Sequence, residues 1–220
     1  MSEHKDTLKV LITGFGAFND HETNPSFEVV KGLPRSIFVG SRRLELVVHP
    51  EPVKVAYRTV RKLLPELYAQ HESIDLVIHL GLDELSQGEY SLEKLARKKG
   101  YDSKDVDGII GDQVNFEAGW EDWGDGPDDL KTSIEVEKVI ENLKDKLESD
   151  VKIRSSNDAG HYLCEYIYYG SLFHFSSVLK KSRLPVTFLH VPASVEARAI
   201  ERGRRILLEV IGSIVLLGFA

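Results

Sequence analysis

A cysteine, a histidine and a glutamate in three distant segments have the side chains that a nucleophilic site needs. Cys164, the only cysteine of the 220-residue chain, closes the segment SNDAGHYLC, while His190 lies in FLHVP and Glu93 in SLEKLA. A cysteine nucleophile needs a base that takes its proton, and an imidazole base needs a carboxylate that orients it. The three residues therefore predict a Cys–His–Glu site if the fold brings them together.

Each of these residues also has a plainer, structural interpretation. Free cysteines are commonly buried without being reactive. His190 could be a hydrogen-bonded core histidine, since His49 and His79 also lie near the ends of apolar runs. Glu93 precedes a lysine, and such glutamates are usually solvated. Taken singly, each residue favours a structural role, and only their combination indicates catalysis.

The elements that must position these residues follow from the spacing of apolar side chains. Short apolar runs predict buried strands, and apolar residues at three- and four-residue steps predict helices. The predicted strands are 8–13, 42–49, 74–81, 151–155 and 185–191, and the predicted helices are 52–70, 133–148, 159–175 and 195–217. This alternation predicts an α/β protein, a single three-layer α/β/α sandwich with a mainly parallel twisted sheet. No repeat or linker divides the chain, so we expect one domain over 1–220.

The predicted sheet gives the histidine and the glutamate a common edge. Ligands of open parallel sheets bind at the carboxyl ends of the strands. His190 lies at that end of the last predicted strand, and Glu93 follows the third. We therefore expect both side chains at the ligand-binding edge.

The cysteine is expected at the beginning of a helix. Cys164 lies within the first turns of the helix that follows strand 151–155, where the helix dipole favours a thiolate. Asn157 or Asp158 is expected to cap this helix, because short polar side chains satisfy the free backbone N–H groups.

One long stretch departs from the regular pattern. Residues 97–131 contain both tryptophans and a cluster of glycines and aspartates. Loops of this length are usually functional or mobile. Its acidic part, 116–129, could be a lid, a contact surface or a passive insertion.

Composition excludes several classes of partner. The chain has 28 lysines and arginines against 35 aspartates and glutamates, a net charge of −7, so it lacks the basic footprint of a nucleic-acid-binding protein. One cysteine excludes an intrachain disulfide and fits a reducing compartment, so we expect a cytoplasmic protein. No secretory signal opens the chain, and the apolar end 206–220 contains Glu209 and is too short to span a membrane.

Cofactor and metal motifs are incomplete. Gly14 and Gly16 follow a strand, but Asn19 replaces the third glycine of a dinucleotide-binding turn. A calcium loop around 103–114 has Ser103 and Val114 at its first and last ligand positions. We expect neither a cofactor nor a bound metal.

The motifs resemble those of the pyroglutamyl peptidase I family, also called pyrrolidone-carboxylate peptidases. SNDAGHYLC is similar to the cysteine motif of that family, SLEKLA to its glutamate motif and FLHVP to its histidine motif. TGFGAF at 13–18 and NPS at 24–26 resemble its N-terminal signature. The likeness runs from about Lys9 to Pro192 and keeps the order Glu, Cys, His.

The resemblance implies roles for individual residues. Cys164 would be the nucleophile, His190 the general base and acid, and Glu93 the orienting carboxylate. Phe15 and Phe18 would form the walls of a pocket for the five-membered lactam, a flat ring that suits aromatic faces.

The lactam also needs polar partners. Backbone groups near residues 81–83, with Leu82 at their centre, and at Leu163 are candidates to pair with its N–H and C=O. Left unpaired in a buried site, these groups would cost about 1–3 kcal/mol.

The sequence departs from the family pattern at four residues and in the spacing from Gly81 to Glu93, which is one residue longer than expected. Glu84 replaces a small residue, Lys98 an asparagine, Ser103 an arginine of the bacterial members, and Glu165 a small polar residue after the cysteine. These departures leave the triad intact and the second oxyanion donor unassigned.

The expected function is that of a cysteine exopeptidase that removes an N-terminal pyroglutamyl residue through a thioester. Its expected partners are pyroglutamylated peptides, and neither nucleic acid nor membrane. One alternative is an inactive relative that binds such peptides or partner proteins. A second is a nucleotide-binding protein that uses Gly14 and Gly16.

Overall fold

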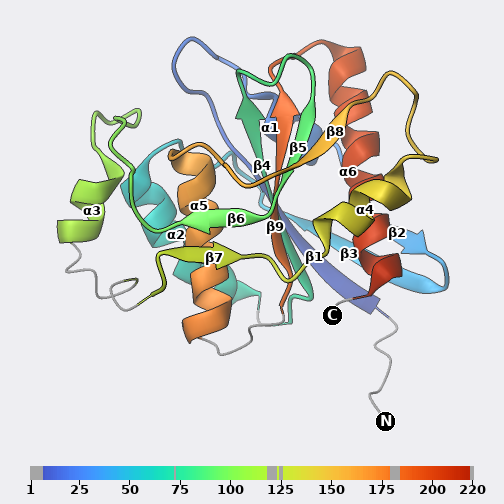
Figure 1. Ribbon diagram of the computed structural model, residues 1–220, viewed down its shortest axis with the longest axis horizontal. Helices are drawn as coiled ribbons and strands as arrows, with labels where there is room; N and C mark the ends of the chain where they lie inside the picture. Colours follow the sequence, from blue (N-terminus) through green and yellow to red (C-terminus); the bar gives the residue numbers. More distant parts are fainter. Residues whose placement is uncertain (1–6, 72, 118–122, 124–125, 179–183, 219–220) are drawn as a thin grey trace.

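A seven-stranded sheet forms the centre of the part of the chain that the structure describes (Figure 1). The structure is a computed structural model, and it describes residues 7–71, 73–117, 123, 126–178 and 184–218. The strands are β1 (Thr7–Gly14), β2 (Ser36–Val39), β3 (Arg42–Val48), β4 (Leu76–Asp83), β5 (Tyr90–Glu93), β8 (Ile153–Ser156) and β9 (Val186–Pro192). They lie in the order β2-β3-β1-β4-β9-β5-β8.

The centre of this sheet is parallel and its margins are not. β3, β1, β4 and β9 run in one direction. β2 is antiparallel to β3, and β5 is antiparallel to β9 while it runs parallel to β8. The prediction of a mainly parallel sheet is therefore confirmed.

Helices cover both faces of the sheet and complete three layers (Figure 1). Successive side chains of a strand point to opposite faces, so each buried strand supplies two cores. On one face Leu11, Val77 and Phe188 pack with α2 and α5; on the other Val10, Ile78 and Leu189 pack with α1, α4 and α6. These helices are α1 (Pro25–Lys31), α2 (Tyr57–Gln70), α4 (Val136–Leu143), α5 (Leu163–Phe173) and α6 (Ala197–Leu217), and a π-helical turn, His174–Val178, extends α5.

Three predicted helices begin later or end earlier than expected. α2 begins at Tyr57 rather than at 52, because Ala56 is extended and Val53 forms a backbone bridge to Phe15. α4 is confined to Val136–Leu143. α5 begins at Leu163 rather than at 159, because Gly160 and His161 have positive φ angles of 96° and 48°.

The expected cap of α5 was therefore wrong. Neither Asn157 nor Asp158 lies at the N-cap position, which Tyr162 occupies without a side-chain hydrogen bond that caps the helix. The first backbone N–H groups of α5 thus have no side-chain cap, although such groups lack partners within the helix.

Two short elements near the site were not predicted. α1 begins at Pro25, and Asn24 caps it by accepting a hydrogen bond from the Ser26 N–H at 3.0 Å. β5 ends at Glu93, so this residue belongs to a strand and does not lie in a loop after β4. The direction of β5 is set by its pairing with β9, which a single sequence does not reveal.

The irregular stretch 97–131 packs over α5. β6 (Leu95–Arg97) pairs with β7 (Asp129–Lys131), and both cross in front of α5 in Figure 1, while α3 (Gly111–Glu117) lies beside α2. Much of the acidic part 116–129 falls outside the described residues, namely 118–122 and 124–125.

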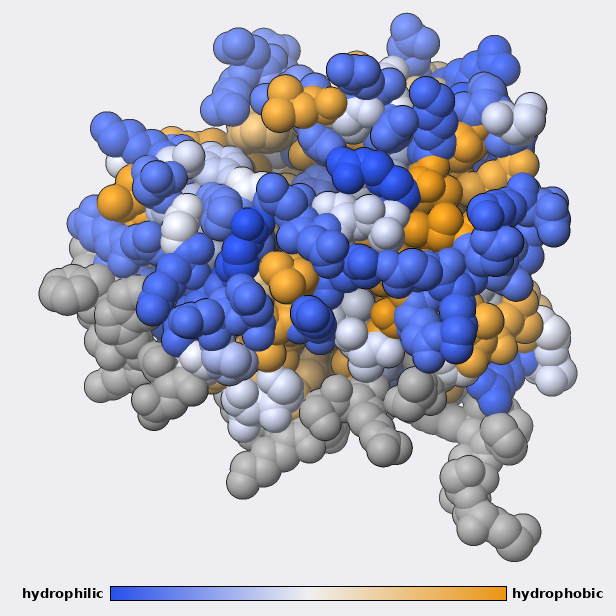
Figure 2. All heavy atoms as spheres, viewed as in Figure 1, coloured by the Kyte–Doolittle hydropathy of each residue, from blue (hydrophilic) through white to orange (hydrophobic). Residues whose placement is uncertain are grey.

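The surface seen in Figure 2 is mostly hydrophilic, and hydrophilic side chains interrupt its apolar ones. None of the helices in the described ranges combines the length and apolarity that a membrane crossing requires.

Candidate active site

A cleft of about 490 Å³ lies where the carboxyl ends of β1, β4 and β9 meet the first turn of α5. Six of the seven residues proposed from the sequence line it, namely Phe15, Phe18, Leu82, Leu163, Cys164 and His190. The seventh, Glu93, is buried behind His190. The fold thus brings together residues that are up to 175 positions apart in the chain (15 to 190).

Cys164 is the second residue of α5, and its side chain is half-buried. Its position requires a glycine on β4. A Cβ atom on Gly81 would lie 2.7 Å from the Cys164 Sγ and 2.6 Å from the Phe188 ring, so a larger residue would displace the thiol.

His190 and Glu93 are joined across the antiparallel strands β9 and β5. Their register pairs Glu93 with Phe188, so Glu93 is a diagonal neighbour of His190. The His190 Nδ1 lies 2.9 Å from the Glu93 Oε1, and both side chains are buried. Since Nδ1–H donates to the carboxylate, Nε2 is the nitrogen left for the hydrogen bond with Cys164.

The surroundings of His190 favour its protonated form. Burial alone would lower the pKa of the ring, because a charge is poorly solvated there. The charge of Cys164 and hydrogen bonds to Cys164 and Glu93 outweigh burial, and they raise the pKa of His190 from 6.5 to about 10. The site therefore supports an imidazolium at His190 at neutral pH.

The other two candidate histidines lie elsewhere. His79 is fully buried, and its Nδ1 and Nε2 lie 2.7 Å from the Thr13 and Ser171 hydroxyls. Burial lowers the pKa of His79 to about 3, so this ring is neutral. His49 does not line the cleft. Neither residue touches Cys164 among the described contacts.

Two aromatic rings and a capped turn shape one side of the cleft. Phe15 is almost fully buried, whereas Phe18 is partly exposed with its ring centroid 6.5 Å from that of Tyr162. The Ser26 hydroxyl accepts the Phe15 N–H at 3.0 Å, and the Asn24 amide donates to the Gly16 carbonyl at 3.0 Å. α1 thus fixes the turn that carries both phenylalanines.

Packing explains the first glycine of this turn, Gly14. A Cβ atom on Gly14 would lie 2.8 Å from the Phe27 Cα, within the backbone of α1. This close approach accounts for the glycine, so the nucleotide-binding alternative loses its motivation.

Sequence reasoning missed Arg97 and the role of Glu165. Glu165 follows Cys164 and is fully buried, and it accepts a hydrogen bond from the Arg97 Nε at 2.8 Å. The available signal was a charged residue on a helix that is otherwise mostly apolar, because a buried carboxylate needs a cationic partner. Lys98 is also buried and donates to the Gly126 carbonyl at 2.5 Å.

One cluster has side chains of the kind that bind metals. Oxygen or nitrogen atoms of Asp158, His161 and Glu165 lie within 4.8 Å of one another. The Arg97 guanidinium pairs with both carboxylates of this cluster. The positive charge that these acids need is therefore supplied by the protein itself.

Comparison with known proteins identifies the family. The family model described as Pyroglutamyl peptidase matches residues 8–206, most of the chain. The chain belongs to the pyroglutamyl peptidase family. The family motifs named above thus lie within a match that covers both the cysteine and the histidine segments.

Individual relatives agree with this assignment. Pyroglutamyl-peptidase 1 of Rattus norvegicus is 33% identical over 184 residues, which cover 83% of this chain and 78% of that protein. Pyrrolidone-carboxylate peptidase of Thermosipho africanus is 31% identical over 189 residues, which cover 84% of this chain and 82% of that protein. Membership of the family supports pyroglutamyl peptidase activity for this chain.

Solved structures show the same fold. Pyrrolidone carboxyl peptidase of Fervidobacterium islandicum superposes with a TM-score of 0.70 at 25% identity, covering 94% of this chain and 100% of that one. A variant of the Pyrococcus furiosus enzyme gives a TM-score of 0.74 at 21% identity, covering 96% and 99%. The predicted α/β architecture is confirmed.

Proposed function

We propose that this pyroglutamyl peptidase acts through Cys164, His190 and Glu93 on peptides that begin with pyroglutamate. The observation that carries the proposal is the position of His190, hydrogen-bonded to Cys164 on one side and to the buried Glu93 carboxylate on the other. No observation in the described residues favours an inactive relative, since the departure at Glu84 lies at the rim of the cleft and leaves these three contacts intact.

The first half of the reaction is acyl transfer to sulfur. The Cys164 thiolate attacks the pyroglutamyl carbonyl carbon, and a C–S bond forms as the carbonyl electrons move to oxygen. The uncapped first-turn N–H groups of α5, with that of Cys164 among them, are available to this oxyanion. His190 gives its proton to the peptide nitrogen as the C–N bond breaks, and a pyroglutamyl thioester remains.

The second half restores the enzyme. The neutral His190 ring takes a proton from water, which attacks the thioester carbonyl. The C–S bond breaks, pyroglutamate leaves, and the thiolate and the imidazolium are present again. Because Glu93 holds the ring by Nδ1, the same Nε2 serves both steps.

Substrate selection follows from the lining of the cleft. The neutral lactam ring lies between Phe15 and Phe18, and backbone groups at Leu82 and Leu163 pair with its N–H and C=O. A prolyl residue has the same ring size, but it carries a charged amine and lacks the lactam carbonyl. It would therefore lose a hydrogen bond and would have to desolvate a charge.

We place the reaction in a reducing compartment, with the cytoplasm as the simplest choice. The proposed nucleophile is the only cysteine, and its thiolate is the form that reacts.

A matched pair of fluorogenic substrates tests this function. Pyroglutamyl-aminomethylcoumarin and prolyl-aminomethylcoumarin differ only in the lactam oxygen and the charge of the ring nitrogen. We expect a kcat/KM for the first that is at least about 10²-fold higher. Equal hydrolysis of both substrates, or none of the pyroglutamyl one by the reduced protein, would contradict the proposal.

A further inference from the structure

The loop between β8 and α5 forms one wall of the cleft. Asp158, Ala159, Gly160 and Tyr162 all line it, and Cys164 follows two residues later. The backbone of this loop is unusual, because His161 adopts a positive φ of 48°, a conformation that non-glycine residues seldom take. Such a conformation persists only where surrounding contacts hold it.

Glu165 supplies the first of these contacts. It is the third residue of α5 and is 0% exposed. Its Oε2 accepts the His161 N–H at 2.8 Å, and its Oε1 accepts the Arg97 N–H at 3.0 Å and the Arg97 Nε–H at 2.8 Å. The carboxylate therefore reaches back over the first turn of its own helix and holds the loop that leads into it.

Arg97 joins the helix to the loop. Its guanidinium donates to Glu165 and also to the Asp158 carboxylate, whose Oδ1 accepts the Gly160 N–H at 3.1 Å. Arginine suits this place because its planar fork contacts two carboxylates at once. Both ends of the loop are thus tied to one side chain.

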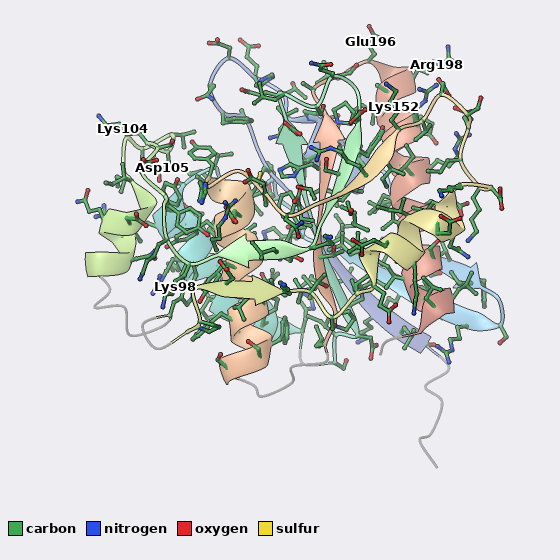
Figure 3. All side chains as sticks on the ribbon, viewed as in Figure 1. Lys98, Lys104, Asp105, Lys152, Glu196 and Arg198 are labelled. Carbon is green, nitrogen blue, oxygen red and sulfur yellow. The ribbon has the colours of Figure 1, made fainter. Side chains whose placement is uncertain are left out.

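The segment that follows Arg97 supports the same loop. A Cβ atom on Gly100 would lie 3.0 Å from the His161 ring, so the ring rests on this glycine. The Tyr162 hydroxyl donates to the Lys104 carbonyl at 3.1 Å. Figure 3 labels Lys98 beside α5 and Lys104 in the loop above α3, so the segment runs from α5 towards α3.

We propose that Arg97 and Glu165 are positioning residues for the reaction, which fix the loop 157–162 and through it the first-turn amides of α5 and the wall of the cleft. The inference rests on the proposed role of Cys164. Neither residue touches the reacting atoms in the proposed mechanism, so both act through the backbone that they hold.

The geometry separates this role from that of the triad. Among the described contacts, the side chains of Arg97 and Glu165 hydrogen-bond neither His190 nor Glu93. Loss of Arg97 should therefore leave the thiolate–imidazolium pair intact while it disturbs acyl transfer. The rate of thiol alkylation measures whether the Cys164–His190 pair is intact, and turnover measures whether acyl transfer is disturbed.

The test compares two rates in one set of variants. For Arg97→Gln we expect kcat for pyroglutamyl-aminomethylcoumarin to fall about 10–100-fold, the effect of a misplaced reaction geometry, while the rate of Cys164 alkylation by iodoacetamide stays at the wild-type value. Arg97→Lys keeps the charge but loses the planar guanidinium fork, and its kcat should lie between those of the wild type and Arg97→Gln. This variant also serves if Arg97→Gln does not fold.

Arg202→Gln is the matched control. The Arg202 side chain is 27% exposed and bridges Glu148 and Asp150. The Arg97 side chain is 26% exposed and bridges Asp158 and Glu165 in the same way. Asp158 lines the cleft, whereas Arg202 and its two partners do not. The kcat of Arg202→Gln should equal that of the wild type.

Two results would overturn the inference. One is a kcat for both Arg97 variants equal to that of the control. The other is a parallel loss of turnover and alkylation, which would place the effect on the Cys–His pair. A wild-type protein that does not hydrolyse the substrate would instead refute the proposed function, so the two failures are distinguishable.

Discussion

The Glu93 carboxylate is buried where water does not solvate it, and its known partner is one ring nitrogen. Oε1 lies 2.9 Å from the His190 Nδ1, whereas Oε2 has no hydrogen-bond partner among the described residues. A buried carboxylate is costly unless it is paired with a positive charge. Glu93 therefore favours the imidazolium form of His190 as well as its orientation.

Replacing Glu93 by glutamine removes the charge and keeps the shape. We expect Glu93→Gln to lower kcat/KM about 10²–10⁴-fold, because both the tautomer and the charge of the ring lose support. In the wild type the pKa of His190 is raised to about 10. The contribution of its proton to the free energy of unfolding is therefore fully present below pH 6.5 and is lost as the pH rises through 10. In the variant this pKa falls, and the alkaline limb of the pH–rate profile should move to lower pH.

A nearby glutamate provides the control for this prediction. Glu137 pairs with Lys94 at 2.6 Å on the surface, and Glu137→Gln should leave the pH–rate profile unchanged. An unshifted alkaline limb in Glu93→Gln would show that the carboxylate does not set the protonation of His190.

Gly81 is the second residue whose identity the site requires. In Gly81→Ala the added methyl group would meet the Cys164 Sγ at 2.7 Å and the Phe188 ring at 2.6 Å. We expect turnover to fall by about 10²-fold or more, because the thiol moves relative to His190. Gly212→Ala is the control, since its Cβ would meet only the Val39 side chain at an ordinary 3.8 Å. Wild-type turnover in Gly81→Ala would contradict the close contact.

At this scale the sequence indicates the side chains proposed to react but not the residues that support them. Cys164, His190 and Glu93 follow from residue type and motif. Gly81 and Arg97 do not, because their roles arise from contacts between segments that are distant in the chain. A glycine inside a buried strand and an acid directly after Cys164 were their only local signals.

Among the elements, those with strong periodicity were predictable. The buried strands β1, β3, β4 and β9 and the helices α2, α5 and α6 each carry their own apolar pattern. β5 is four residues long with all four buried, so it has no alternation, and its direction depends on pairing with β9. The predicted start of α5 was wrong because the polar residues before the helix hydrogen-bond within the loop and do not cap the helix.

A buried hydrogen-bond network joins four of these elements. The His79 ring on β4 contacts Thr13 on β1 and Ser171 on α5, and the Tyr68 hydroxyl on α2 donates to Ser171 at 2.6 Å. Ser171 in turn donates to the Ile167 carbonyl at 2.7 Å, so its oxygen accepts from both His79 and Tyr68. Nε2 of His79 therefore carries the proton, and Nδ1 accepts from Thr13.

This network predicts a pH-dependent stability. The folded-state pKa of His79 is lowered to about 3, below its ordinary 6.5, so its contribution is present above pH 6.5 and is lost as the pH falls from 6.5 towards 3. We expect His79→Gln to lose about 1–3 kcal/mol of unfolding free energy at neutral pH, because buried hydroxyls lose partners. Its stability should also fall less steeply with acid than that of the wild type.

Denaturant titrations at several pH values measure both effects. Equal acid slopes for the two proteins would show that His79 is not held neutral in the folded state.

For the whole molecule, the sheet separates two apolar cores and leaves the cleft at one edge of the sheet. Phe15 belongs to the core shared by α2 and α5 and also lines the cleft. A ligand that fills the cleft therefore contacts Phe15, which is also packed into this core. Binding should stabilise the folded chain as a unit, by mass action.

Thermal unfolding with the isolated lactam ring measures this coupling. At 100 times its Kd, 2-pyrrolidone should add about 2.7 kcal/mol to the wild type and raise its Tm. Phe18→Ala should reduce the shift at the same concentration, whereas Phe38→Ala, at a side chain 72% exposed on β2, should not. An equal shift in both variants would remove Phe18 from the pocket wall.

The most direct test of the central claim is turnover of pyroglutamyl-aminomethylcoumarin by Cys164→Ala beside the wild type. Since no other residue of the chain is a cysteine, loss of this sulfur removes the proposed nucleophile completely. We predict hydrolysis by the wild type, its abolition by iodoacetamide, and no measurable hydrolysis by a folded Cys164→Ala variant. Turnover by that variant at the wild-type rate would contradict the claim.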